Sequence, residues 1–532
     1  MTAPSRFRAV AGWIAVAAFV AVPLLRLAAG ASGSAIGEVV ADPRTAQALA
    51  GSLLTSAPAA VLATFLGTLF AYATERMAVP GRMVLRLLVL APLIIPPFVS
   101  AISIELTYGP FGLLDALTGV RATWIEGPIG VALVIAVNAM PLAYLAAVAA
   151  LASGSEVEAE RAGRVSGASA LRVFTTITLP MLRPAAAGGA LLAFVFGLNS
   201  FGVPIVLGTP AGFDTLTTEV YRGLVRSADP AAFDRVVVLA TVLAVLGLLT
   251  VLLLDRAGGT GVLAVRAGPS GGAVPAAPAK MAAAAIWGWS LLVVVIPVAG
   301  LVVRSLVPAP GVPPVPANWS LGNFAGLFDT RTLSALGRST ALAAIAAAGV
   351  LVLAGIGVAE GRVGRRGIGI AGALGYAVPG SALAVAVLLA YRVPLADTLA
   401  IILVAYLAKF WALGHRSLAG AAVRLGDDPL RAARASGASG FTLIRTVVVP
   451  SLAPALVAAG LLVFLFGLHE LTMSSLLRGP GTDTLAVVVL DVQQLGDAGR
   501  TSALAVVLTL LVVAASVPLV AARRSWRRVT GT

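Results

Sequence analysis

Apolar residues occur along this chain in long runs, separated by short stretches rich in arginine, glycine and proline. A helix needs about 20 mostly apolar residues to cross the hydrocarbon core of a bilayer. Runs of that length predict about 12 transmembrane helices, at residues 9–29, 49–73, 84–107, 128–151, 184–207, 233–254, 284–306, 335–358, 368–391, 397–418, 452–476 and 501–522. They form two sets of six, so the pattern predicts an all-α membrane protein.

Composition supports the lipid bilayer as the chain's surroundings. Of 532 residues, 59% are hydrophobic and only 11% are charged, and the mean hydropathy is +0.99. A soluble domain cannot bury that much apolar surface. Cysteine is absent, which excludes disulfides and thiolate metal sites. The net charge is +14, but the arginines gather in short loops between apolar runs, which indicates an orientation signal and no nucleic-acid surface.

The loops predict how the halves lie in the membrane. Lysine and arginine are more frequent in loops on the side of the N-terminus, which places both termini in the cytoplasm. An even number of spans returns the chain to the same side, so the two halves form parallel repeats about an axis along the membrane normal. The predicted organisation is a first half (1–255), a cytoplasmic linker rich in Gly, Pro and Ala (256–283) and a second half (284–532).

One polar element between the fourth and fifth spans occurs in both halves. The segments are "RAGRVSGASALRVFTTITLP" (161–180) and "RAARASGASGFTLIRTVVVP" (431–450), which align without a gap at an offset of 270 residues. The neighbouring spans have diverged far more than this element. Retention of the element therefore indicates the same partner twice, although amphipathic loop helices kept by gene duplication are the simpler alternative.

Each copy is expected to form two short helices joined at a corner. A glycine should end the first helix in the left-handed conformation, a serine should cap the next, and a proline should mark the return to the membrane. These residues are Gly167, Ser169 and Pro180 in the first copy and Gly437, Ser439 and Pro450 in the second.

The spacing x-Ala-Ala/Gly-x3-Gly-x9-Ile/Val-x-Leu/Val-Pro resembles the EAA loop of ABC-importer permeases. The resemblance implies the type I (MetI-like) permease fold, with coupling helices that sit in grooves of ATP-hydrolysing subunits. It places them in loops 153–182 and 420–450, here called the first and second repeat loops. The coupling positions are Arg161, Ala162, Gly163, Gly167, Ala168, Ser169 and Pro180, and Arg431, Ala432, Ala433, Gly437, Ala438, Ser439 and Pro450.

The repeat loops depart from the family at one position. Arg161 and Arg431 stand where the family usually has glutamate, so a glutamate-to-arginine contact with the ATPase is not implied. Instead, the partner surface is expected to carry a changed charge.

The chain is expected not to hydrolyse ATP. A phosphate-binding Gly-x4-Gly-Lys-Ser/Thr loop needs a lysine, and neither Lys280 nor Lys409 has that context. No cofactor is therefore expected on this chain. The resemblance implies ATP and Mg on partner subunits, two copies of an ABC ATPase, and an extracytoplasmic solute-binding protein. It also implies a multi-pass protein of the bacterial cell membrane.

Polar residues in the fifth and eleventh spans are candidates for the substrate pathway. The sequence "FGL" is followed by Asn199 and Ser200 in one half and by His469 and Glu470 in the other. A carboxylate at mid-membrane costs about 2.5–3.5 kcal/mol, so it usually has a function. We expect these four residues, with Lys409, to face the pore. His469 and Glu470 would be transient metal ligands at most, and the alternative is that Glu470 only pairs with Lys409.

The segments around these residues (196–221 and 466–489) are similar to fused permeases of ferric-iron importers. This similarity implies ferric iron as the substrate; related permeases for thiamine, sulfate, molybdate, phosphonate or polyamines are the alternatives. A secondary transporter of the major facilitator type is an alternative of another class, because "GVAEGRVGRRG" (357–367) resembles that family's loop. A membrane-embedded enzyme is a third reading, for which two histidines and no cysteine are a poor inventory.

Overall fold

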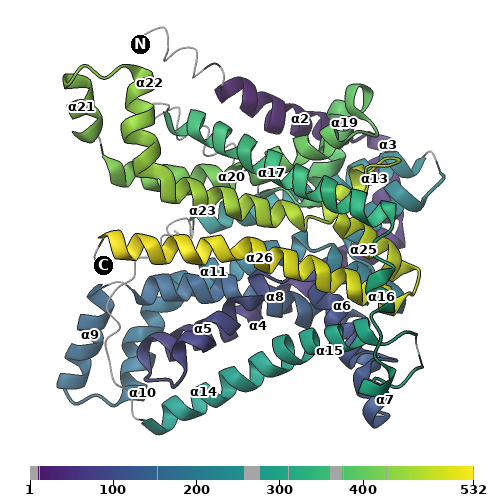
Figure 1. Cartoon of the computed structure of the whole chain (residues 1–532), viewed down its shortest axis with the longest axis horizontal. Helices are drawn as coiled ribbons and strands as arrows, with labels where there is room; N and C mark the ends of the chain where they lie inside the picture. The colour runs from purple at the N-terminus through teal and green to yellow at the C-terminus, as the bar shows by residue number, and fades with distance from the viewer. Residues whose placement is uncertain are drawn as a thin grey trace.

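The computed structural model describes residues 12–152, 154–229, 231–256, 276–309, 311–359, 377–426 and 428–530, together with residues 10, 374 and 375. Helices make up most of this part of the chain, and no strand occurs within it. The long helices run between two ends that carry short helices and loops (Figure 1). The predicted all-α membrane architecture is confirmed.

The first half begins with a helix over Gly12–Gly30, which contains η1 (Ala17–Ala21) and α2 (Val22–Gly30). The helices that follow are α3 (Gly33–Ala41), α4 (Pro43–Arg76), α5 (Arg82–Leu90), α6 (Pro97–Tyr108), α7 (Leu113–Thr118), α8 (Pro128–Leu151), α9 (Gly154–Val165), α10 (Ala170–Val173), α11 (Leu179–Asn199), α12 (Leu216–Tyr221) and α13 (Ala231–Arg256).

The second half repeats this order with a different number of short helices. Its elements are α14 (Ala276–Ser290), η9 (Leu291–Val295), α15 (Ile296–Leu306), α16 (Gly322–Ala325), α17 (Thr330–Ala359), α19 (Gly380–Leu395), α20 (Leu399–Leu425), α21 (Asp428–Ala435), α22 (Gly440–Leu443), α23 (Val449–Leu468), α24 (Thr472–Leu477), α25 (Leu485–Gln494) and α26 (Ala498–Thr530). The predicted linker lies mostly outside the described residues, but α14 begins before the predicted start of this half at 284.

Ten described helices are long and apolar enough to cross a membrane, and an eleventh span counts if one bent pair is included. The bent pair is Arg82–Leu93 with Pro97–Thr118, at 102°. The remaining predicted span, 368–391, begins outside the described residues, and its described part is the shorter helix α19. The described helices therefore account for the predicted spans, although several are longer than predicted.

Proline bends the third span, which the hydropathy pattern predicts as one segment (84–107). Pro96 lies before α6 in an extended conformation, with φ −55° and ψ 135°. Proline has no N–H to continue a helix, and it disfavours the α conformation in the residue before it. Pro379 occupies the same place before α19, with φ −54° and ψ 144°. Both third-span helices thus begin inside the molecule.

The two halves form similar three-helix cores, α4 with α8 and α11, and α17 with α20 and α23. Close approach in the first core depends on Gly67, where a Cβ would lie 2.7 Å from the backbone nitrogen of Tyr144. The first span of each half also packs on the other half, α2 against α19 and α15 against α6.

A matched pair of hydrogen bonds accompanies this exchange. Tyr108 at the end of α6 donates to the carbonyl of Leu292 at 2.7 Å, and Tyr391 in α19 donates to the carbonyl of Ala18. Both carbonyls lie in π-helical turns of a first span, η9 and η1. The halves are therefore joined through their outer helices in a pseudo-symmetric way.

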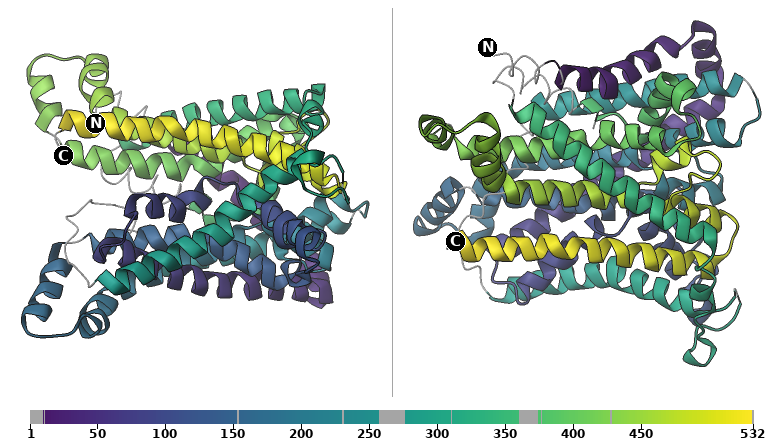
Figure 2. Two further views of the ribbon diagram at one scale, coloured as in Figure 1. Left: turned by 60° about the horizontal axis from the view of Figure 1, so that its bottom comes forward. Right: turned by 45° about the horizontal axis from the view of Figure 1, so that its top comes forward.

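The two ends of the molecule differ. Helices α9, α10, α21 and α22 project from one end in two separate pairs, and α26 also finishes there (Figure 1). Two further views show the same two projections at that end (Figure 2). The short helices α3, α7, α16 and α25 lie at the opposite end. We call these the loop end and the outer end.

Candidate functional site

The backbone corners of the two repeat loops have the same geometry. Gly167 has φ +84° and Gly437 has φ +80°, a conformation that glycine adopts without strain. In the first corner the N–H of Ala168 donates to the carbonyl of Gly163 at 3.1 Å, and Gly167 donates to Arg164 at 3.0 Å. These two bonds define a Schellman helix end.

The second corner repeats both bonds one for one. Ala438 donates to the carbonyl of Ala433 and Gly437 donates to that of Arg434, both at 3.0 Å. The predicted left-handed glycines are confirmed. The predicted serine caps are confirmed too: Ser169 accepts from the N–H of Arg172 at 3.3 Å and Ser439 from that of Thr442 at 3.2 Å.

Pro180 and Pro450 lie in the first turn of α11 and of α23, and the return to the membrane at these prolines stays a prediction. α10 continues through the π-helical turn η4 (Phe174–Thr178) into α11, so one helix covers Ala170–Asn199. In the second half, η11 (Ile444–Val448) joins α22 to α23 in the same way. A π-helical turn bonds residues five apart, and it accommodates a proline that follows it.

The two corners also expose equivalent surfaces. In both copies the arginine and alanine that open the motif, the corner glycine and the capping serine are exposed, while the third and eighth positions are half-buried. The exposed residues are Arg161, Ala162, Gly167 and Ser169, and Arg431, Ala432, Gly437 and Ser439; the half-buried ones are Gly163 and Ala168, and Ala433 and Ala438. The two loops differ in exposure at Arg164, which is half-buried while Arg434 is exposed, and at Pro180, which is half-buried while Pro450 is exposed. A partner would therefore meet nearly the same shape twice.

A buried ionic link, which the sequence reasoning missed, attaches the first corner to the spans. Arg76, the last residue of α4, donates from Nε to both carboxylate oxygens of Glu160 at 3.0 and 3.2 Å. Its guanidinium also donates to the carbonyl of Leu151 at 2.8 Å, and Thr178 donates to Glu160 at 2.9 Å. Arg76 is 3% and Glu160 4% exposed. The link joins α4, α8, α9 and η4.

A central cavity of about 200 Å³ lies between the halves, where the fifth and eleventh spans are broken. α11 ends at Asn199, and α23 ends at Leu468 before the short helix α24. The uninterrupted spans predicted at 184–207 and 452–476 are therefore interrupted at the polar dipeptides. The cavity is lined by Pro92, Leu93, Pro97, Phe98, Asn138, Phe196, Asn199, Ser200, Phe201, Gly202, Phe410, Phe466, His469, Glu470, Leu471 and Thr472.

Four of the five predicted pathway residues, Asn199, Ser200, His469 and Glu470, line this cavity, and Lys409 reaches it through Asn199. The Lys409 ammonium donates to Asn199 Oδ1 at 3.3 Å and to the carbonyl of Val378 at 2.6 Å. His469 is buried at 9% exposure, and its Nδ1 has no hydrogen-bond partner in the described part of the chain.

Glu470 also has a structural role that the sequence did not indicate. Its carboxylate accepts from the N–H of Met473 at 2.9 Å, from the N–H of Ser474 at 3.0 Å and from the Ser474 hydroxyl at 3.1 Å. It thus satisfies N–H groups at the start of α24, which would otherwise be unpaired. Within the described residues no group of three His, Cys, Asp or Glu side chains could hold a metal ion.

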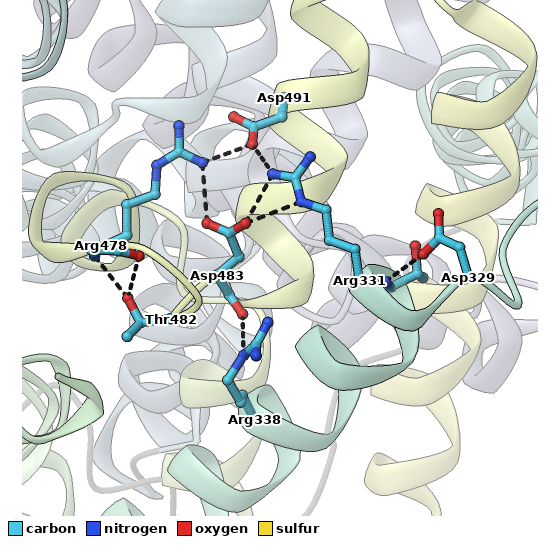
Figure 3. Close-up of polar contacts among 9 residues, drawn as sticks. Asp329, Arg331, Arg338, Arg478, Thr482, Asp483 and Asp491 are labelled. Carbon is cyan, nitrogen blue, oxygen red and sulfur yellow. Dashed lines mark hydrogen bonds and ion pairs between the residues drawn. The ribbon is translucent and has the colours of Figure 1, made fainter. Parts of the chain in front are cut away.

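A network of arginines and aspartates at the outer end is a second feature that sequence reasoning missed (Figure 3). Arg331 at the start of α17 contacts Asp483 at 2.9 Å and Asp491 at 2.5 Å, and Arg478 contacts Asp491 at 2.7 Å. Arg338 donates to the carbonyl of Asp483 at 2.9 Å. These contacts attach the segment between α24 and α25 to α17.

A repeated pentapeptide could have revealed the outer-end feature. "GFDTL" (212–216) and "GTDTL" (481–485) occupy the same place in the two halves. The N–H of Leu216 donates to the Ser52 hydroxyl and that of Leu485 to the Ser339 hydroxyl, both at 2.8 Å. In the first half the side-chain hydrogen bond with Asp214 raises the pKa of Arg222. Each pentapeptide thus ties a loop at this end of the molecule to the second span of its half.

Comparison with known proteins gives a matching family, one relative that is similar along nearly the whole chain, and relatives that are similar to part of it. The family described as binding-protein-dependent transport system inner membrane component matches twice, at residues 63–257 and 349–525. A probable ABC transporter permease protein y4fN of Sinorhizobium fredii is 26% identical over 97% of this chain and 95% of that protein.

Two shorter matches are to permeases of named transport systems. A molybdenum transport system permease protein ModB of Mycobacterium bovis is 33% identical over 45% of this chain and 89% of that protein. A ferric transport system permease protein FbpB of Actinobacillus pleuropneumoniae is 29% identical over 32% of this chain and 26% of that protein.

Proposed function

Because the chain belongs to the family of binding-protein-dependent transport system inner membrane components, with two fused family domains, we propose that it forms the whole substrate pathway of an ABC importer. It is a multi-pass membrane protein and a transport subunit. Partners of two kinds accompany permeases of this family in general, an ATPase and a solute-binding protein. The finer assignments below are our proposals.

The twin corners are the observation that carries the proposal. Two Schellman ends with matching bond lengths and matching exposed surfaces project from one end of a chain whose spans have otherwise diverged. We propose that each corner docks one copy of a separate ATPase subunit, which holds ATP and Mg, and that the loop end faces the cytoplasm. Arg161 and Arg431, both exposed, would then meet acidic groups of the ATPase.

Continuous helices support a mechanical connection between the corners and the cavity. In the first half one helix runs from Ala170, beside the corner, to Asn199, at the cavity. At 1.5 Å per residue this helix is about 45 Å long. α23 likewise leads from the second corner towards His469. A displacement of either corner would therefore move one wall of the cavity, as alternating access requires.

The cavity is lined mostly by apolar residues. Asn199, Ser200, His469 and Glu470 come from the two broken spans, and phenylalanines make up much of the remaining wall. We propose that the solute passes between these four residues, with Lys409 holding Asn199 in place. A binding protein at the outer end would deliver the solute.

Ferric iron is our first proposal for the substrate, and molybdate is the second. The ferric relative supports iron, whereas the molybdenum relative is more identical and matches over more of its own length. His469 and Glu470 would contact a ferric complex only in passing, since the described residues provide no coordination cluster. The two solutes have opposite charges, so they are easily told apart.

The proposal is tested by reconstituting the chain in vesicles with its ATPase and binding protein. We expect uptake of radiolabelled iron or molybdate that requires ATP, with Glu470→Ala lowering it. Uptake that proceeds without any ATPase would contradict the importer assignment and favour a secondary transporter. Uptake of neither ion would overturn both substrate proposals.

A further inference from the structure

The link between Arg76 and Glu160 differs from the surface ion pairs of this protein in its burial and its connections. Both side chains are at most 5% exposed, and four hydrogen bonds join them to each other, to Leu151 and to Thr178. Surface ion pairs contribute little because water competes for both charges. In a buried pair, by contrast, each charge depends on the other, so the geometry is held strongly.

The link connects both arms of the first corner to the ends of two spans. Glu160 lies in α9, on the near side of the corner, and Thr178 lies in η4, on the far side. Arg76 and Leu151 are the last residues of α4 and α8, two helices of the first core. The carboxylate of Glu160 therefore holds both arms of the corner against the ends of two spans.

The second repeat loop carries apolar residues at the equivalent positions. At the offset of 270 residues that aligns the two loops, Leu430 replaces Glu160 and Val448 replaces Thr178. Leu430 is half-buried, so it still packs inward. This loop cannot form the same ionic link, although its corner has the same backbone geometry.

We propose that Arg76, Glu160 and Thr178 are positioning residues that make the first corner rigid with the first core, so that ATP-driven displacement passes mainly through the first half. This rests on the proposed function. The first corner and the ends of α4 and α8 then move as one body. The second corner follows its ATPase with more freedom and transmits displacement mainly through the helix that continues into α23.

The absence of cysteine from the sequence makes a direct test simple. Spin labels on Val165→Cys, 90% exposed at the first corner, and on Phe65→Cys, 63% exposed in α4, report the distance between corner and core. In the triple variant Arg76→Leu/Glu160→Leu/Thr178→Val the distance distribution should become about twice as wide. We use the triple variant because removing both charges leaves neither one buried alone.

A matched measurement in the second half provides the control. Labels on Ala435→Cys and Val423→Cys, both exposed, should give the same distribution in the triple variant and in the original chain. Leu430→Ala should broaden only this second distribution. If the first distribution stays as narrow in the triple variant as in the original chain, the positioning role is wrong.

Coupling is measured separately, in the complete complex with its ATPase. The triple variant should hydrolyse ATP at an unchanged rate but transport about tenfold fewer solute molecules per ATP, within the range typical of coupling between sites. A purely structural role would lower both quantities together and would contradict the proposal. If the original complex shows no ATP-driven uptake, the proposed function fails, whereas the label distances still decide whether the link holds the corner.

Discussion

The two repeat loops are alike on the outside and different on the inside. Their corners share left-handed glycines, serine caps and Schellman bonds whose lengths agree within 0.1 Å. Behind the corners, the first loop has the buried pair of Arg76 and Glu160, while the second has Leu430 and Val448. Duplication therefore preserved the surface that a partner would meet and left the attachment to the spans free to change.

This difference separates two properties of each loop: the contact that its corner makes with a partner, and the movement that it passes on to the spans. Equal corners predict equal contacts with two copies of one partner, whereas unequal attachments predict unequal movement of the two halves. A fused chain can hold such a difference permanently, because its first and second halves always occupy the same positions.

The largest effect is expected from breaking what the two corners share. Gly167→Pro and Gly437→Pro should each abolish ATP-driven uptake, because proline requires φ near −65° where these residues have +84° and +80°. Membrane insertion should be unchanged. Gly440→Ala, at a glycine with no positive φ and open space around it, is the matched control and should transport normally. Full uptake by either proline variant would show that its corner is not needed.

A second large effect should appear in only one loop. Arg76→Leu leaves the Glu160 carboxylate buried without its partner and should lower the free energy of unfolding by about 3–5 kcal/mol. The double variant Arg76→Leu/Glu160→Leu should be clearly more stable than the single one. Leu430→Gln places a polar group at the position equivalent to Glu160, and it should cost less because Leu430 is only half-buried. Thermal unfolding in detergent measures all three, and equal stability of the single and double variants would contradict a buried pair.

A smaller effect concerns how each corner packs on its own helix. A Cβ at Gly163 would lie 2.8 Å from Cδ1 of Ile177, the end of a flexible side chain, so Gly163→Ala should cost about 1 kcal/mol through overpacking, the low end of the usual range. At the equivalent positions the second loop has Ala433 and Val447, a larger residue facing a smaller one. Gly163→Ala/Ile177→Val should therefore recover most of the loss. No recovery in a melting experiment would mean that the two loops do not pack alike.

The smallest effect is expected at the outer end, where Asp329 caps α17. The N–H of Thr332, with Arg500, lowers the pKa of the Asp329 carboxyl. Because its pKa is lower in the folded state, Asp329 stabilises the protein above its unfolded pKa, and this contribution is lost as the pH falls through the folded pKa. Asp329→Asn should thus reduce the acid-induced drop in melting temperature slightly. The equivalent cap at α4, changed in Asp42→Asn, provides the comparison, and a larger drop in Asp329→Asn would reverse the sign assigned here.

Much of the architecture could be predicted from local sequence signals. Span positions follow from apolar runs, and the corners follow from glycine and serine at fixed spacing, because both depend on residues close together in the chain. The polar residues of the cavity were also predictable, since Asn199 and His469 follow the same "FGL" motif in broken spans.

Long-range features could not be predicted in the same way. The contact of Arg76 with Glu160 joins residues 84 positions apart, and neither residue has a distinctive neighbourhood. The packing of each first span on the other half likewise depends on the whole fold. The capping role of Glu470 was hidden because a hydropathy pattern records that a carboxylate is in a span but not that the span is broken there.

Site-specific cross-linking to the ATPase tests the central claim most directly. The chain has no cysteine of its own, so cysteines introduced as Val165→Cys and Ala435→Cys, at equivalent exposed positions, would be the only ones. Every cross-link from the chain can then be assigned to one of these two positions. In a complex that shows ATP-driven uptake, both positions should cross-link to an ATPase subunit, with similar yields. Uptake by a complex in which both cysteines stay accessible to water-soluble reagents and neither reaches an ATPase would contradict the account.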